Sequence, residues 1–208
     1  MPTPFQTSRL TYRAIEDTDE PFIHSLQLHP PSFATSNATL LRPQSTRDTK
    51  TGYFKYLTSE KALLATIIEL SPNTTTLPTP TTIQIGAISL RAPPPDHAHH
   101  RETALTIDIA AEHQGQGYGS EAIAWALRWA FRVAGLHRVT VEAVGYNTDA
   151  VRLYRRLGFV VEGRKREAVW FEGRWYDFVI LGMLEGEWRG TRDGEGGEIG
   201  TGTGTGSS

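Results

Sequence analysis

Hydrophobic and polar positions alternate most regularly in the second half of the chain. Residues 103–109 and 138–144 alternate with a period of two, which predicts strands. Between them, residues 120–133 place their apolar side chains on one face at a period of 3.6, which predicts a helix that Gly135 ends. A short helix is expected over 148–157. The remaining strands expected in this half are 159–162, 166–171 and 175–184, the last two joined by a hairpin turn.

The first half is less regular. Strands are expected over 9–13, 62–70 and 83–90, with a helix over 21–28. The Pro- and Ser-rich residues 30–45 predict a loop. Ser45 is a candidate cap for a second helix that carries Tyr53, Phe54 and Leu57. The Pro-rich stretches 71–82 and 92–101 predict loop insertions.

Strands that alternate with helices and then close in a hairpin predict an α/β (α+β) fold with a mixed sheet of about six to seven strands. We expect one domain over residues 1–188. The tail 189–208 is rich in glycine and threonine, and we expect it to be disordered because it has too little apolar surface to bury.

Charge and composition narrow the function classes. The 208-residue chain has a net charge of −2, which argues against a nucleic-acid partner. It has no cysteine, which excludes a thiolate nucleophile and a Cys-based zinc site. His97, His99 and His100 cluster in a Pro-rich loop without a carboxylate at ligand spacing, so no metal is expected. No signal peptide or membrane-spanning run is visible, so we expect no membrane partner and a cytoplasmic location, with the nucleus possible.

The glycine loop, residues 114–120, follows an expected strand and opens the long helix. Glycines at such a turn let backbone N–H groups approach a phosphate at the positive end of the helix dipole. The spacing misses the third glycine of a dinucleotide-binding turn, and there is no lysine for a Walker A loop. It does fit Gln-x-x-Gly-x-Gly, through Gln114, Gly117 and Gly119. Taken alone, the loop could equally be a tight turn with no ligand.

The order of motifs after the loop is more specific. A strand is followed by Asn147-x-x-Ala150, Tyr154-x-x-Leu157-Gly-Phe and Trp175-Tyr-Asp. This order resembles the GNAT superfamily of acetyl-CoA-dependent N-acetyltransferases, and within it the branch of ribosomal-protein and spermidine acetyltransferases. The likeness is clear over residues 103–188 and rests only on element order before that. It implies the GNAT fold, with the sheet splayed between its fourth and fifth strands.

The resemblance implies acetyl-CoA as the bound cofactor. The glycine loop would bind its pyrophosphate through backbone N–H groups, and the backbone of Ile107 and Ile109 would pair with the pantetheine arm. Asn147 would contact the cofactor, and Tyr154 would face its sulfur. The positions implied to bind the cofactor are Ile107, Ile109, Gln114, Gly115, Gln116, Gly117, Tyr118, Gly119, Ser120, Asn147, Tyr154 and Arg156.

Two catalytic residues are expected. Tyr154 matches the family tyrosine whose hydroxyl can donate a proton to a leaving thiolate. The glutamate that relatives often carry as a general base falls here on Ala104. Asp108 lies on the same strand face by the period of two and closer to the reaction centre. Asp108 is therefore the favoured base, with Glu102 or a chain of waters as alternatives.

The acceptor would be a primary amine that attacks the thioester directly in a ternary complex. Trp170, Trp175 and Tyr176 would form an aromatic wall of the acceptor pocket. A small amine, a polyamine and a protein N-terminus all stay open as acceptors. So do a monomer and a homodimer, and a non-catalytic acyl-CoA-binding module remains the alternative function.

Overall fold

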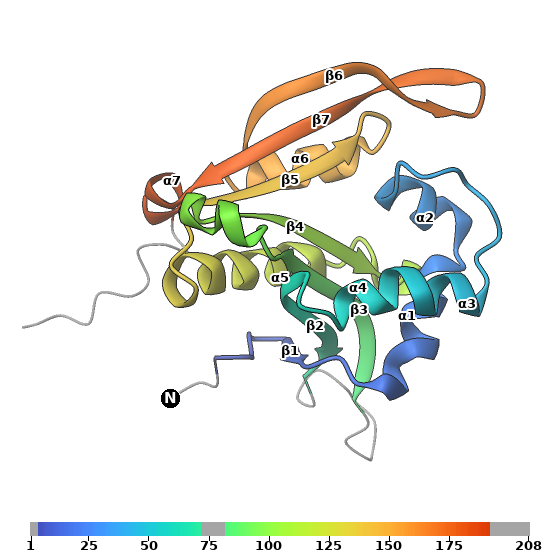
Figure 1. Cartoon of the computed structure of the whole chain (residues 1–208), viewed down its shortest axis with the longest axis horizontal. Coiled ribbons are helices and arrows are strands. Elements are labelled where there is room, and N and C mark those ends of the chain that lie inside the picture. The colour runs from blue at the N-terminus through green and yellow to red at the C-terminus, as the bar shows by residue number, and fades with distance from the viewer. Residues whose placement is uncertain (1–3, 72–81, 192–208) are drawn as a thin grey trace, which may run out of the picture.

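A seven-stranded sheet forms the centre of the computed structural model, which describes residues 4–71 and 82–191 (Figure 1). The strand order is β1-β2-β3-β4-β5-β7-β6. All neighbouring strands are antiparallel except β4 and β5, which are parallel. This confirms the mixed α/β sheet of about six to seven strands. The strands are β1 (Leu10–Arg13), β2 (Ala62–Leu70), β3 (Ile83–Arg91), β4 (Glu102–Ile109), β5 (Arg138–Val144), β6 (Val160–Phe171) and β7 (Arg174–Leu184).

Helices cover both faces of the sheet. The α-helices are α1 (Glu20–Gln27), α2 (Pro30–Ser36), α3 (Thr46–Thr49), α4 (Lys55–Leu57), α5 (Tyr118–Arg128), α6 (Thr148–Arg156) and α7 (Glu185–Arg189). Two π-helical segments, η2 (Lys50–Phe54) and η6 (Trp129–Val133), continue α3 and α5. Three 3-10 turns complete the set: η1 (Asp17–Asp19), η4 (Pro95–His100) and η5 (Ala111–His113).

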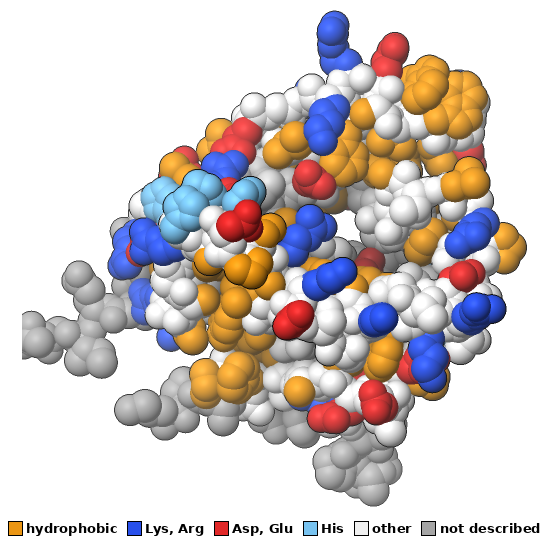
Figure 2. Space-filling view, in the orientation of Figure 1, with side chains coloured by type: hydrophobic (Ala, Val, Ile, Leu, Met, Phe, Trp, Pro, Cys, Tyr) orange, Lys and Arg blue, Asp and Glu red, His pale blue; other side chains and the backbone are white. Residues whose placement is uncertain are grey.

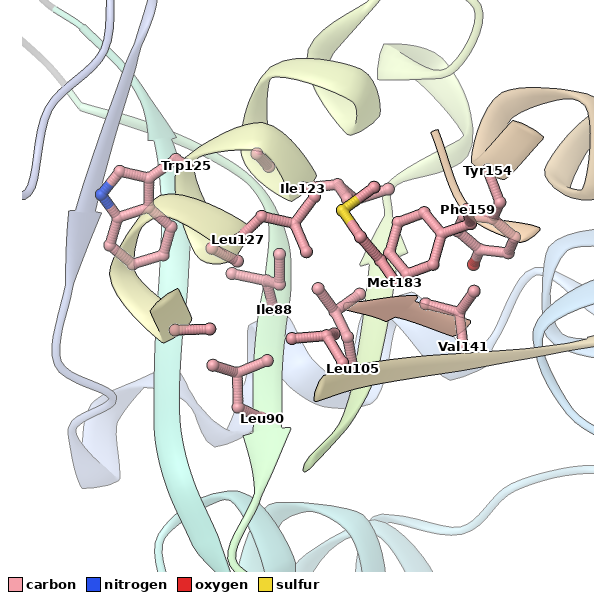
Figure 3. Close-up of a cluster of buried hydrophobic side chains, with 14 of the residues drawn as sticks. Ile88, Leu90, Leu105, Ile123, Trp125, Leu127, Val141, Tyr154, Phe159 and Met183 are labelled. Carbon is pink, nitrogen blue, oxygen red and sulfur yellow. The ribbon is translucent and has the colours of Figure 1, made fainter. Parts of the chain in front are cut away.

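Two hydrophobic clusters hold these layers together. The larger lies between the sheet and α5, where Ile123 and Leu127 pack with Ile88 and Leu105 (Figure 3). The smaller lies on the opposite face and joins α1, η2 and α4 to the sheet; its buried members are Ile23, Phe54, Leu57, Ile67 and Ala87. The apolar helix faces expected from the sequence therefore pack against the two faces of one sheet.

One expected loop was wrong. Residues 30–45 were expected to be irregular, but α2 occupies Pro30–Ser36. Pro30 and Pro31 fit the first helical turn, where a missing N–H costs nothing. His29 caps the turn, because its Nδ1 accepts the Ser32 N–H at 3.3 Å. The prolines that end α1 therefore begin the next helix.

Two other expectations changed at their boundaries. The strands expected over 159–162 and 166–171 are one strand, β6, with an irregular pairing between Lys165 and Val169. The 92–101 insertion contains the turn η4. Most of the 71–82 insertion and of the 189–208 tail, residues 72–81 and 192–208, lies outside the described residues.

A buried polar cluster fastens β1 to β2, β3 and η1. Arg13 donates to both carboxylate oxygens of Asp19, at 2.7 and 2.8 Å, and to Glu69 at 2.6 Å. Gln84 donates to Asp19 at 2.7 Å. Both carboxylate side chains are almost fully buried, at 4% and 6% exposure. The Arg13 guanidinium is the main reason that the pKa of Asp19 is lowered.

Arg13→Met is expected to lower the free energy of unfolding by about 3 kcal/mol, because two buried carboxylates lose their cation. This value is at the low end for buried pairs because Arg13 itself is 34% exposed. The loss should be full above the ordinary aspartate pKa of about 3.9 and shrink as pH falls through the lowered pKa of Asp19. Urea unfolding at pH 7 and at pH 3 measures both effects.

Arg152→Met is the matched control, since Arg152 pairs with the exposed Asp149 on the surface of α6. It should change stability by less than about 0.5 kcal/mol. Equal losses in the two variants would contradict a structural role for the buried cluster.

Candidate active site

The sheet opens between β4 and β5. These strands pair only where Glu102–Ala104 lie beside Arg138–Thr140. Beyond that point β4 remains paired with β3 as far as Ile109, and β5 remains paired with β7 as far as Val144. This confirms the splay expected between the fourth and fifth strands. Figure 2 shows the molecular surface hollowed in the same region.

Gly86 allows β3 to hold the far end of β4 closely. A Cβ on Gly86 would lie 2.3 Å from the carbonyl oxygen of Asp108, which is too close for any other residue. Asp108 thus turns its backbone toward β3. By alternation along the strand, the N–H and C=O groups of Ile107 and Ile109 face the opening. They form an open strand edge to which an extended ligand can pair.

The glycine loop lies at the end of this edge. Gly115 and Gly117 have φ values of 72° and 84°, a left-handed conformation that favours glycine. The first intrahelical bond of α5 runs from the Glu121 N–H to the Gly117 carbonyl. The N–H groups of the first turn, Tyr118 to Ser120, therefore lie beyond the helix ladder, and Gly117 offers no side-chain cap. Free N–H groups at the positive end of a helix suit an anion.

Two side chains outside the helix fix the position of the loop. Gln114 Nε2 donates to the Ile109 carbonyl at 2.8 Å, which ties the loop to the open edge of β4. Arg9 Nη1 donates to the Gln116 carbonyl at 3.0 Å, and Arg9 Nε pairs with Glu121 at 2.7 Å. The Arg9 guanidinium also covers the Tyr118 ring at 4.6 Å. Gln114 thus acts here through its side chain as a tether.

Helix α6 borders the opening from the β5 side. Asn147 caps it: Oδ1 accepts the Ala150 N–H at 3.0 Å, and Nδ2 donates to the Thr35 carbonyl of α2 at 3.0 Å. Tyr154 lies further along α6 against Phe159, with its hydroxyl on the side of Val141 (Figure 3). Burial raises the pKa of Tyr154 to about 12, and the charge of Asp108 adds to the shift.

Asp108 lies at a small pocket on the opposite face of the sheet. Its Oδ2 accepts a hydrogen bond from the Tyr53 hydroxyl at 2.7 Å. The pocket has a volume of about 90 Å³ and includes Phe33 and Ser36 of α2. Burial raises the pKa of Asp108, although hydrogen bonds from Tyr53 and Ser36 oppose the rise. A carboxylate with a raised pKa is a stronger base than one in water.

The two expected catalytic residues therefore approach the opening from different sides. Side chains alternate along β4, so Asp108 faces α1, α2 and η2, whereas Ile107 and Ile109 pack with the cluster that contains Tyr154. Burial raises the pKa of Tyr154, and the negative charge of Asp108 adds a smaller contribution to that rise.

Glu102, the alternative base, lies elsewhere. It pairs with Arg138 in the closed part of the sheet and is six residues from Asp108, roughly 20 Å along an extended strand. Ala104 also lies in the closed part. Arg156 is exposed in the last turn of α6, about 200° around the helix from Tyr154.

The aromatic hairpin residues separate onto two faces. Trp170 pairs directly with Trp175, and both are more than half exposed, so they share one face. Tyr176 lies on the other face, where it contacts the Tyr146 ring at 4.9 Å. Tyr146 in turn donates to the Ala34 carbonyl of α2 at 2.6 Å. The expected single aromatic wall is thus divided, because successive residues of a strand point to opposite sides.

Tyr53 and Ser36 were not identified as site residues from the sequence. Tyr53 was expected only as an apolar residue of a helix, and Ser36 fell in the region expected to be a loop. The π-helical η2 changes the register that carries Tyr53, and nothing in the residue pattern signals this change. Both contacts depend on segments that are distant in sequence.

Within the described residues, no helix is long and apolar enough to cross a membrane. The same residues contain no group of three or more His, Asp and Glu side chains placed to hold a metal ion. His97, His99 and His100 contact one another in η4.

Comparisons with known proteins agree with this geometry. Residues 9–160 match the family model of the acetyltransferase (GNAT) domain. The spermidine N(1)-acetyltransferase of Vibrio cholerae serotype O1 is 35% identical over 89 residues, 43% of this chain and 51% of that protein. The alanine N-acetyltransferase of ribosomal protein uS5 from Escherichia coli K12 is 30% identical over 84 residues, 40% of this chain and 43% of that protein. In these alignments the chain spans about half the length of the curated relatives it matches.

Among solved structures, the spermidine N-acetyltransferase of Vibrio cholerae in complex with CoA and spermine superposes with a TM-score of 0.73 at 27% identity. The match covers 88% of this chain and 99% of that one. The family model spans well over half of the chain, and the splayed sheet, glycine loop and α6 tyrosine occur in the expected order. The chain belongs to the GNAT family of acetyltransferases.

Proposed function

We propose that the protein is an acetyl-CoA-dependent N-acetyltransferase that acetylates a primary amine by direct attack in a ternary complex. One observation carries the proposal: the opening between β4 and β5 has Tyr154 on one side and Asp108 on the other. The similar structure of the Vibrio cholerae spermidine N-acetyltransferase contains CoA, which supports acetyl-CoA as the acyl donor.

The residues around the opening fit CoA. The N–H groups of Tyr118 to Ser120 are suited to the pyrophosphate, and the open edge at Ile107 and Ile109 is suited to the amide-containing pantetheine arm. One of these edge groups, the Ile109 carbonyl, already accepts from Gln114, so the arm would use the groups that remain. When bound, acetyl-CoA supplies an activated acetyl thioester.

The protein residues would then manage two protons. Asp108 Oδ2, held by Tyr53, would accept a proton from the attacking amine. The Tyr154 hydroxyl keeps its own proton at neutral pH, since its pKa is about 12, and would supply it where a thiolate departs. Alignment of the two reactants in the opening would contribute most of the acceleration.

Tyr154→Phe tests this proposal. We expect kcat to fall at least ~100-fold, because the proton donor is lost, while the Kd for CoA stays within about twofold. Acetylation of a panel of primary amines gives kcat, and calorimetry gives the Kd. Tyr56→Phe makes the same chemical change at a tyrosine of α4 and serves as the control.

Full activity in Tyr154→Phe would remove Tyr154 from the mechanism. No turnover of any amine by the wild-type protein, with CoA still bound, would favour the alternative of a non-catalytic acyl-CoA-binding module.

A further inference from the structure

We infer that helix α2 bridges the opening between β4 and β5, and that Tyr146 and Asn147 act through it as positioning residues for Asp108. This inference deepens the proposed function, on which its catalytic consequence rests. It comes from the hydrogen bonds that α2 makes to both sides of the opening.

Tyr146 and Asn147 hold α2 from the β5 side. The Tyr146 hydroxyl donates to the Ala34 carbonyl at 2.6 Å, and Asn147 Nδ2 donates to the Thr35 carbonyl at 3.0 Å. Both carbonyls belong to the last turn of α2, where a helix has no N–H groups of its own to offer them. The two side chains therefore complete the end of a seven-residue helix that is too short to be stable alone.

The β4 side contacts the same helix. Gln114 Nε2, at the start of the glycine loop, donates to the Ser32 hydroxyl at 3.2 Å. The Ser36 hydroxyl, at the end of α2, forms a hydrogen bond with the Asp108 carboxylate. Helix α2 thus connects the two strands beyond the point at which their pairing ends (Figure 1).

The hydrogen bond from Ser36 affects the expected base. Burial raises the pKa of Asp108, and the bonds from Tyr53 and Ser36 oppose the rise because they stabilise the carboxylate. Ser36 stays within reach of Asp108 only while the last turn of α2 stays in place. Loss of an anchor of α2 should therefore raise the pKa of Asp108 further and leave the base protonated over a wider pH range.

Few other groups that titrate interact with Asp108. Among the described residues that line its pocket, α1 and α2 contribute only uncharged side chains, those of Leu26, Gln27, Phe33, Ser36 and Asn37. The titratable groups that interact with it are the hydroxyls of Tyr53 and Tyr154, and both keep their protons at neutral pH because burial raises their pKa. A change in the titration of Asp108 can therefore be assigned to the bond from α2.

One side chain joins α2 to the other half of the site. Asn147 Oδ1 accepts the Ala150 N–H at 3.0 Å and so caps α6, the helix that carries Tyr154. The same amide holds the end of α2 through Nδ2. The hydrogen bond to Asp108 and the hydroxyl of Tyr154 thus come from two helices that share one anchor.

Tyr146→Phe tests the inference. The Tyr146 ring contacts the rings of Phe171 at 4.7 Å and Tyr176 at 4.9 Å, so phenylalanine keeps this packing and loses only the bond to α2. With the best amine of the panel, kcat/KM at pH 6 should fall at least ~10-fold and at pH 9 much less, because the base of the variant is protonated up to a higher pH. The Kd for CoA should stay within about twofold.

Two further variants show whether the effect passes through α2. Ser36→Ala removes the bond to Asp108 itself and should give the same change of the pH profile. The double variant should lose no more than Ser36→Ala alone, because both side chains act on one bond. Ser25→Ala is the matched control and should keep the wild-type profile, since its hydroxyl donates to the Phe22 carbonyl within α1.

An NMR titration of Asp108 gives a measurement that needs no turnover. In protein with ¹³C-labelled aspartate, the Asp108 signal, assigned from Asp108→Asn, should titrate at a higher pH in Tyr146→Phe and Ser36→Ala than in the wild type. Such a shift in a protein that acetylates no amine would overturn the proposed function and leave the positioning role of α2 standing. An unchanged titration, equal losses of kcat/KM at pH 6 and pH 9, or additive losses in the double variant would overturn the inference.

Discussion

Gly119→Glu is expected to weaken CoA binding by at least ~100-fold, about 2.7 kcal/mol, without unfolding the protein. Gly119 lies in the first turn of α5, and a Cβ there would meet only the Leu153 side chain of α6, at 3.9 Å. The glutamate would place its side chain and negative charge where a pyrophosphate must approach. The same charge is favourable for the helix, because it lies at the positive end of the helix dipole.

A substitution at Gly119 tests occlusion of the phosphate site without adding backbone strain. Gly115 and Gly117 have positive φ values, so any side chain at those positions would distort the loop itself. Gly119 is not among the residues with positive φ. Calorimetry gives the Kd for CoA, and thermal unfolding gives Tm. Gly119→Ala should lose much less affinity than Gly119→Glu. Unchanged affinity in Gly119→Glu at an unchanged Tm would refute the assignment of the glycine loop.

Asp108→Asn is expected to reduce kcat ~10²- to 10⁴-fold, because the amide cannot accept the proton of the amine. It should also stabilise the protein at neutral pH, on the order of 1 kcal/mol or roughly 3 °C in Tm. The reason is that burial disfavours the carboxylate, whereas a neutral amide can still accept from Tyr53. Loss of activity with a gain in stability is the behaviour of a functional group kept at a cost.

The gain in stability of Asp108→Asn over the wild type should increase with pH. The pKa of Asp108 is raised in the folded protein, so wild-type stability from this group is complete below its unfolded pKa and is lost as pH rises through the folded pKa. The Tm difference between variant and wild type should therefore be larger at pH 8 than at pH 4. Asp96→Asn, in exposed η4, should change neither kcat nor Tm. A wild-type rate in Asp108→Asn would transfer the base to water or to another group.

Local sequence patterns were sufficient to place the elements on which the expected cofactor site lies. The strand expected over 138–144 is β5 without a change of boundary, and the glycine loop leads directly into α5. Both follow from short-range rules: alternation, helical periodicity and the turns that glycine permits. The position of Tyr154 also follows, since it depends only on its place in α6.

The acceptor side depends on contacts that the sequence does not display. Tyr53 donates a hydrogen bond to Asp108, although the two residues are 55 positions apart in the sequence. The π-helical segment that carries Tyr53 has no signature in the residue pattern. Helix α2 was not predicted because a pair of prolines usually marks the end of a helix and not its beginning. Only the cap by His29 distinguishes the two cases. The hairpin aromatics were expected to form one wall, but their division between two faces depends on the register of β6 with β7.

Hydrogen–deuterium exchange of the wild-type protein with and without acetyl-CoA tests the central claim most directly. If backbone N–H groups of the glycine loop and the open edge of β4 hold the acyl donor, peptides over residues 105–110 and 115–121 should become strongly protected. Peptides over the exposed hairpin end at Trp170 to Trp175 should not change. Saturating acetyl-CoA that leaves residues 115–121 unprotected, or that protects another part of the chain instead, would contradict the account.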